Sequence, residues 1–223
     1  MRDYSVAASG FDYAQVASAT LQGSLEALNA CVECCDRHVG SNKIALNWEG
    51  RDGEQAQFSF EQLQQQAARF ANVLRAQGVG PGDRVAGLLP RIPELLVTIL
   101  ASWRLGAVYQ PLFTAFGPKA IEHRLHQSDA RVVITDAGNR SKLDEVVACP
   151  TIISIGAQSG SDDVDFRQAL NAAADQCEPV LLDGDAPFLM MFTSGTTGPA
   201  KPLMVPLRAI VAFQGYMRDA IDL

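Results

Sequence analysis

The stretch FLMMFTSGTTGPAK, residues Phe188–Lys201, runs from an apolar segment into a loop of small hydroxyl residues, glycines and a lysine. Gly195 and Gly198 permit backbone angles that bring successive N–H groups close to an anion. The Ser and Thr hydroxyls add hydrogen-bond donors, and Lys201 adds a mobile positive charge. An apolar strand that leads into such a loop is typical of phosphate binding. Nucleotide binding is therefore the leading hypothesis.

The loop departs from the Walker pattern, in which Gly and four further residues precede Gly-Lys-Ser/Thr at the start of a helix. Here Gly195 and four residues are followed by Ala200-Lys201-Pro202. Pro202 has no hydroxyl to bind magnesium, so the Walker interpretation loses its metal ligand. The alternative is that this stretch is a structural hairpin with a surface lysine and binds no ligand. The composition of the loop disfavours this alternative.

Strands and helices alternate along the chain before this loop. A hairpin is predicted over Lys43–Trp48 and Ala56–Phe60, and Ser59 with Gln62 predicts a capping-box start for a helix that ends before Gly78. Further strands are predicted at Arg84–Leu89, Ala107–Pro111, Arg131–Thr135, Thr151–Ile155 and Pro187–Phe192. Further helices are predicted at Leu21–Arg37, Pro93–Leu105, Pro118–Gln127, Leu143–Val147 and Asp165–Ala174. This order indicates an α/β fold, with a mostly parallel sheet, flanking helices and ligands at the carboxyl ends of the strands.

The segment Phe192–Gly198 followed by Lys201 resembles the phosphate-loop signature of the adenylate-forming (AMP-binding) superfamily. That superfamily includes acyl-CoA synthetases, luciferases and the adenylation domains of peptide synthetases. Other segments are similar in order and spacing to acetyl-CoA and medium-chain acyl-CoA synthetases: Cys35–His38, Asn42–Trp48, Asp83–Pro90, Ile92–Leu95 and Gly106–Phe113. The resemblance covers roughly Leu25 to the end and implies the N-terminal part of the large domain of such an enzyme.

The resemblance implies a two-step reaction for the parent protein, which would require ATP, Mg²⁺ and coenzyme A. A carboxylic acid is first joined to the α-phosphate of ATP, and the thiol of coenzyme A then attacks the acyl-adenylate. Lys201 is implied as the catalytic residue that balances the charge of the departing pyrophosphate. The implied ATP phosphate-binding residues are Thr193, Ser194, Gly195, Thr196, Thr197 and Gly198.

A weaker part of the resemblance concerns coenzyme A. Phe113 and Arg140 occupy positions similar to those of an aromatic residue and an arginine near the nucleotide end of coenzyme A in acetyl-CoA synthetases. The alternative is that Phe113 belongs to the core and that Arg140 is a solvated surface charge.

The sequence also departs from the family. Relatives usually have Pro-Lys-Gly where this chain has Ala200-Lys201-Pro202, and Pro202 removes one backbone donor. The motifs that relatives carry downstream are not in this sequence, so we expect residues 21–223 to be the N-terminal portion of an AMP-binding domain, truncated after the phosphate loop, and inactive alone. Residues 1–20 are expected to be mobile. The alternatives are a non-catalytic nucleotide-binding or interaction module, and an adenylation domain that serves a carrier protein.

Composition narrows the classes of function. The chain has 223 residues, 48% of them hydrophobic, and a formal net charge of −7. An acidic chain without basic clusters is a poor candidate for nucleic-acid binding. No stretch reaches the roughly 18 continuous apolar residues of a membrane span, and no apolar signal region opens the chain, so a cytoplasmic location is expected. The expected partners are small molecules, and the sequence sets no oligomeric state.

Cysteines and histidines could in principle form a metal site. Cys31, Cys34 and Cys35 lie close to His38, but helical spacing and the odd count of five cysteines favour free thiols. His123 and His126 lie three residues apart on a predicted helix, and no third ligand is evident, so they are interpreted as surface residues. No metal site is predicted.

Overall fold

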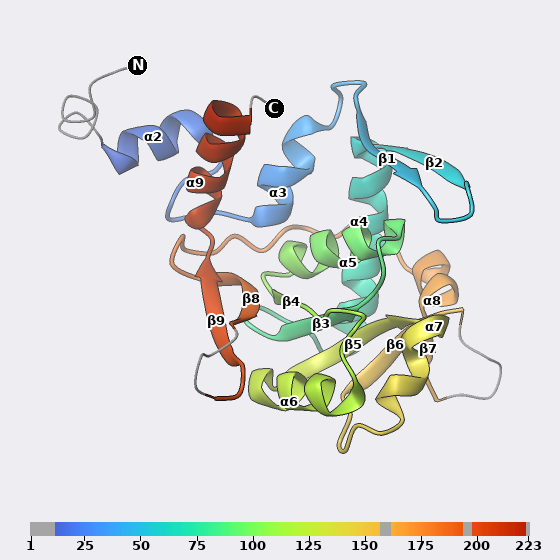
Figure 1. Cartoon of the computed structure of the whole chain (residues 1–223). Coiled ribbons are helices and arrows are strands. Elements are labelled where there is room, and N and C mark those ends of the chain that lie inside the picture. The colour runs from blue at the N-terminus through green and yellow to red at the C-terminus, as the bar shows by residue number, and fades with distance from the viewer. Residues whose placement is uncertain (1–11, 157–161, 194–197, 222–223) are drawn as a thin grey trace.

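The computed structural model describes residues 12–156, 162–193 and 198–221. Within these residues seven strands form one sheet in the order β7-β6-β5-β3-β4-β8-β9 (Figure 1). All neighbouring strands are parallel except β9, which runs antiparallel to β8. The bounds are β3 (Arg84–Leu88), β4 (Val108–Pro111), β5 (Ala130–Asp136), β6 (Thr151–Ile155), β7 (Val164–Asp165), β8 (Pro187–Thr193) and β9 (Lys201–Pro206). The prediction of an α/β fold with a mostly parallel sheet is confirmed.

Helices cover both faces of this sheet (Figure 1). On one face, α4 (Phe60–Ala76), α5 (Pro93–Arg104) and α8 (Phe166–Ala172) share a core with Val85 of β3 and Ile134 of β5. On the other face, α6 (Pro118–Ser128) and the 3-10 helix η2 (Ser141–Leu143) pack on Ala86 of β3 and Val133 of β5. Successive residues of a strand point to opposite faces, so an uninterrupted apolar run such as β3 requires helices on both sides.

The predicted hairpin is confirmed as β1 (Ile44–Glu49) and β2 (Gln55–Ser59), which pair antiparallel. Its second strand leads directly into α4. Ser59 accepts from the Gln62 backbone and the Gln62 side chain accepts from the Ser59 backbone, which is the capping box expected from the sequence. In the described part of the chain no helix is both long and apolar enough to span a bilayer.

The single helix predicted over Leu21–Arg37 is wrong. The structure has α2 (Tyr13–Thr20), then an irregular segment, then α3 (Ala30–Cys34) and the 3-10 helix η1 (Asp36–His38). Buried polar contacts hold this bent path: Glu33 accepts from the backbone of Gln22 and Gly23. Asn29 caps α3 and donates to the carbonyls of Trp103 and Val180. α2 comes from the segment expected to be mobile, and it packs on α9 (Ala209–Tyr216), which the π-helix η3 (Met217–Ile221) follows.

The helix predicted at Leu143–Val147 is also wrong. The helical segment starts earlier, as α7 (Ala137–Arg140), and continues through η2 to Leu143. The cause is local, because the Asp136 carboxylate accepts from the Gly138 backbone and the Asn139 side chain. Strands β7 and β9 were not predicted, since β7 has two residues and β9 contains two prolines.

A buried ion pair joins α5 to η1. Arg104 Nη1 lies 2.7 Å from Asp36 Oδ2, and the two side chains are 8% and 13% exposed. Arg104 Nε also donates to the carbonyl of Cys177. Because the guanidinium bonds to both segments, it fixes the N-terminal region and the chain before β8 against the end of α5.

We expect Asp36→Ala to lower the free energy of unfolding by about 3–5 kcal/mol, because it leaves the Arg104 guanidinium buried without its carboxylate. The matched control is Asp175→Ala, which removes an exposed pair with Arg69 at 3.5 Å and should cost less than about 1 kcal/mol. Urea unfolding of both variants measures the difference. Equal losses would contradict the role given to the buried pair.

Candidate functional site

The phosphate-loop sequence lies at the turn of the β8–β9 hairpin (Figure 1). The antiparallel register continues to the pair Thr193 and Lys201, the last residue of β8 and the first of β9. Ser194, Gly195, Thr196 and Thr197 lie outside the described residues. A Walker loop leads from a strand into a helix, whereas this loop leads from a strand into a strand. The hairpin therefore agrees with the rejection of the Walker pattern.

The described ends of the loop are open to solvent. Thr193, Gly198 and Lys201 are all exposed. The Thr193 hydroxyl lies 3.5 Å from the carbonyl oxygen of Lys201, to which it donates. A Cβ at Gly198 would meet no atom within 4 Å, so close packing does not require glycine there. A hydroxyl and an ammonium group are thus presented together at the carboxyl end of β8.

Helix α6 contacts the hairpin beside this loop. His123 Nε2 lies 3.0 Å from the carbonyl oxygen of Ala200. The Arg124 guanidinium lies over the ring of Phe116 at 4.0 Å and near that of Phe192 at 5.5 Å. Neither contact was expected from the sequence, which indicated that His123 is a surface residue. The other histidine of the pair, His126, bonds instead to the carbonyl of Val147.

Phe113 follows β4 and Arg140 ends α7, which follows β5, so both come after the carboxyl ends of parallel strands that flank β3. Phe113 comes after β4, its side chain is 65% exposed, and its ring packs edge-on against Phe116. Lys142 connects the two regions, because its ammonium group donates to the Thr114 carbonyl and to the Asn139 side chain. Phe113 is therefore not a core residue. Lys142 was not singled out from the sequence, and no spacing signal marks it.

Arg140 is held by two carboxylates and is not a solvated charge. Its Nη2 lies 3.0 Å from Asp163 Oδ1, and its Nη1 lies 2.6 Å from Asp144 Oδ1. A second bond joins Nε to Asp163, whose side chain is 5% exposed. The hydrogen bonds to Asp163 raise the pKa of the Arg140 guanidinium above its ordinary value. An anion that binds Arg140 must therefore compete with these carboxylates.

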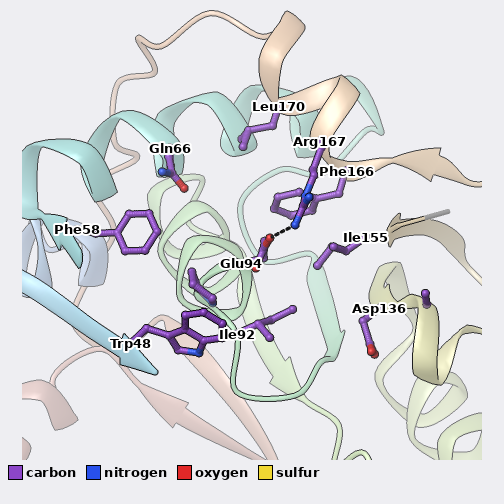
Figure 2. Close-up of a pocket in the computed structure, with 12 residues that line it drawn as sticks. Trp48, Phe58, Gln66, Ile92, Glu94, Asp136, Ile155, Phe166, Arg167 and Leu170 are labelled. Carbon is purple, nitrogen blue, oxygen red and sulfur yellow. Dashed lines mark hydrogen bonds and ion pairs between the residues drawn. The ribbon is translucent and has the colours of Figure 1, made fainter. Parts of the chain in front are cut away.

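A cavity of about 590 Å³ opens at the carboxyl ends of β5 and β6, between the β1–β2 hairpin and α8 (Figure 2). Its walls are largely apolar, and Trp48, Phe58, Ile92 and Phe166 supply most of the large side chains. Glu94 and Arg167 form an ion pair of 3.3 Å at one side. None of its lining residues belongs to the phosphate-loop sequence. Its walls come from eight separate elements, so no local motif marked it.

The cysteines are free thiols. Burial raises the pKa of Cys149 to about 11, so this side chain stays protonated at neutral pH. Within the described ranges no group of three or more His, Cys, Asp or Glu side chains is arranged to hold a metal ion.

Comparisons with known proteins agree with the fold. Acetyl-coenzyme A synthetases from Chlorobaculum tepidum and Saccharophagus degradans are 33% and 36% identical over 199 residues, which is 79% of this chain. The chain spans about 30% of the length of these curated relatives. The crystal structure of Brucella canis acyl-CoA synthetase matches 100% of this chain and 41% of its own, with 49% identity and a TM-score of 0.94.

A more distant solved structure agrees as well. Acetoacetyl-CoA synthetase from Streptomyces lividans is 27% identical, with a TM-score of 0.79, over 88% of this chain and 33% of its own. The family described as AMP-binding enzyme matches residues 34–222, which is most of the chain. The loop at the end of β8 is thus part of a fold and a sequence that are shared along nearly the whole chain, and the protein belongs to the AMP-binding enzyme family.

Proposed function

We propose that this chain is the N-terminal portion of the adenylating domain of an acid–thiol ligase. The whole protein would join a carboxylate to the α-phosphate of ATP, release pyrophosphate and transfer the acyl group to coenzyme A. The observation that carries the proposal is the pairing of two exposed residues, Thr193 and Lys201, on either side of the phosphate-loop sequence at the end of β8. The match to an acyl-CoA synthetase structure over the full chain supports it.

The proposed chemistry depends on charge and position. A carboxylate and ATP are both anionic, so the reaction needs groups that hold them together and neutralise the charge that builds up. The side chain of Lys201 is exposed at the start of β9, and the Thr193 hydroxyl lies on the paired strand. We assign Lys201 to the charge of the departing pyrophosphate. Thr193, Gly198 and the residues between them are assigned to the β- and γ-phosphates of magnesium-bound ATP.

We assign the nucleotide end of coenzyme A to Phe113 and Arg140. The exposed ring of Phe113 offers a stacking surface for a base. Arg140 carries the positive charge that a phosphate requires, but Asp163 and Asp144 already accept from three of its five N–H groups. A phosphate at Arg140 would therefore share the guanidinium with two carboxylates, which repel it. This makes Phe113 the stronger of the two assignments.

We assign the reaction to the whole protein, because this chain spans about 30% of the length of the curated relatives. The parent protein is the form to test first, with the 223-residue chain beside it.

The adenylation step predicts acid-dependent exchange of pyrophosphate into ATP by the whole protein. Lys201→Ala should lower the rate about 100-fold, the usual effect of removing a group that stabilises charge in a transition state. Lys43→Ala, which changes another exposed lysine, is the control and should retain the rate. The 223-residue chain alone should show no exchange. No exchange by the whole protein with any short or medium carboxylic acid would contradict the ligase function and favour a non-catalytic nucleotide-binding module.

The thiol-transfer step predicts that Phe113→Ala raises the KM for coenzyme A about tenfold, because a lost stacking contact costs about 1–3 kcal/mol. Pyrophosphate exchange, which needs no coenzyme A, should be unchanged. Val147→Ala is the matched control, since Val147 is 70% exposed but precedes β6 and so lies at the opposite edge of the sheet. An unchanged KM in Phe113→Ala would contradict the assignment.

Arg140 needs a variant of a different design. Arg140→Ala alone leaves the buried Asp163 carboxylate without its partner, and unfolding would then obscure any effect on binding. The double variant Arg140→Ala/Asp163→Ala removes both charges. It should raise the KM for coenzyme A with a smaller loss of stability than Arg140→Ala, measured by urea unfolding.

A further inference from the structure

Two consecutive residues of α6 hold the two strands that lead into and out of the loop. His123 bonds to the carbonyl of Ala200, the residue before Lys201. Arg124 contacts the ring of Phe192, the residue before Thr193. His123 also approaches the Phe192 ring edge-on, at 6.5 Å between ring centres. One turn of one helix thus contacts both ends of the hairpin turn.

These contacts are separate from the packing that holds α6 on the sheet. Ile121 and Leu125 are the buried apolar residues of that face, with exposures of 0% and 2%. His123 and Arg124 lie between them in the sequence, are half-buried, and turn toward the hairpin. The core contacts would keep α6 in place without either side chain.

The backbone at this turn of α6 is itself fixed from the sheet. Gln110 of β4 is fully buried, and its Nε2 donates to the carbonyl of Arg124 at 3.2 Å. Arg124 Nη1 donates to the Ala120 carbonyl, and the guanidinium lies over the Phe116 ring. No carboxylate of the described residues forms an ion pair with Arg124. The planar guanidinium of Arg124 therefore makes cation–π contacts with aromatic rings, and these contacts depend on its orientation.

The hairpin needs such support because β9 is an edge strand. Among the described residues its one strand neighbour is β8. Pro202 and Pro206 carry no N–H, so β9 offers no backbone donor to a further strand at these two positions. The pair of Thr193 and Lys201 is the last pair of the ladder before the loop. The bond from His123 of α6 to the carbonyl of Ala200 fixes this end of the hairpin.

We propose that His123 and Arg124 are positioning residues that hold the β8 and β9 ends of the phosphate loop, so that the Thr193 hydroxyl and the Lys201 ammonium group stay at a fixed separation. This inference rests on the proposed function of the loop in binding ATP. A carbonyl oxygen only accepts, so the proton of the bond to Ala200 is on His123 Nε2. Neither residue is assigned a contact with the substrate.

The first test compares His123→Leu with His126→Leu in the whole protein. Both variants remove a histidine bond to a carbonyl from the same helix, but His126 bonds to Val147 and not to the hairpin. Hydrogen exchange of the β8–β9 backbone should become faster in His123→Leu and stay as in the wild type in His126→Leu. The KM for ATP should rise about two- to tenfold in His123→Leu, the range set by one hydrogen bond, with the KM for the carboxylic acid unchanged.

Conservative variants separate positioning from a general loss of fold. His123→Gln retains an N–H donor that can reach Ala200, so it should restore the ATP KM to within about twofold of the wild type. Arg124→Leu removes both ring contacts, and Arg124→Lys keeps the charge without the planar group. We expect Arg124→Leu to speed exchange in β8 more than Arg124→Lys does, with exchange in β3 and β5 unchanged in both.

The two proposals fail in different ways. Unchanged hydrogen exchange of the hairpin in both His123→Leu and Arg124→Leu would overturn the positioning role, whatever the activity. So would equal effects of His123→Leu and His126→Leu on the hairpin. Faster hairpin exchange in His123→Leu, together with a wild-type protein that adenylates no acid, would support the positioning role and contradict the proposed function.

Discussion

Strand β3 must bury both of its faces, and this requirement sets the arrangement of the rest of the molecule. Val85 faces the core under α4 and α5, whereas Ala86 and Leu88 face the core under α6. The connection from β3 to β4 covers one face and the connection from β4 to β5 the other, because right-handed crossovers that leave in opposite directions lie on opposite faces. Crossovers that leave in opposite directions leave space beyond the carboxyl ends of the strands. Both the cavity beside Glu94 and the loop after β8 lie at this end of the sheet.

The sequence predicted those elements whose cause is local or repeated. The buried strands read as apolar runs, and the capping box of Ser59 and Gln62 fixed the start of α4 within one residue. The segment before Arg37 was predicted wrongly because its apolar spacing fits a helix, while Glu33 and Asn29 hold a bent path by bonds to distant backbone groups. Local spacing does not reveal bonds between residues as far apart as Asn29 and Val180.

The same distinction applies to the candidate site. Hydroxyl residues, glycines and Lys201 stand together in the sequence, so the loop could be recognised from its composition. The groups around it could not, since His123 and Ala200 are 77 residues apart and Arg140 and Asp163 are 23 apart. The sequence does not show whether water or two carboxylates surround the Arg140 guanidinium. Only the fold distinguishes a free cation from a cation whose charge is already shared with two carboxylates.

The departure of the loop from its relatives has a physical consequence at Lys201. Pro199 and Pro202 stand on either side of Ala200-Lys201, and each fixes its own φ near −65°. A residue that precedes proline is driven to extended angles, which is the conformation of Lys201 in β9. The lost N–H of Pro202 costs little on an edge strand. In exchange, the backbone around Lys201 has less freedom to lose when an anion binds, and the bond from His123 restricts it further. A proline in place of a glycine therefore favours a loop end that is already ordered over one that orders on binding.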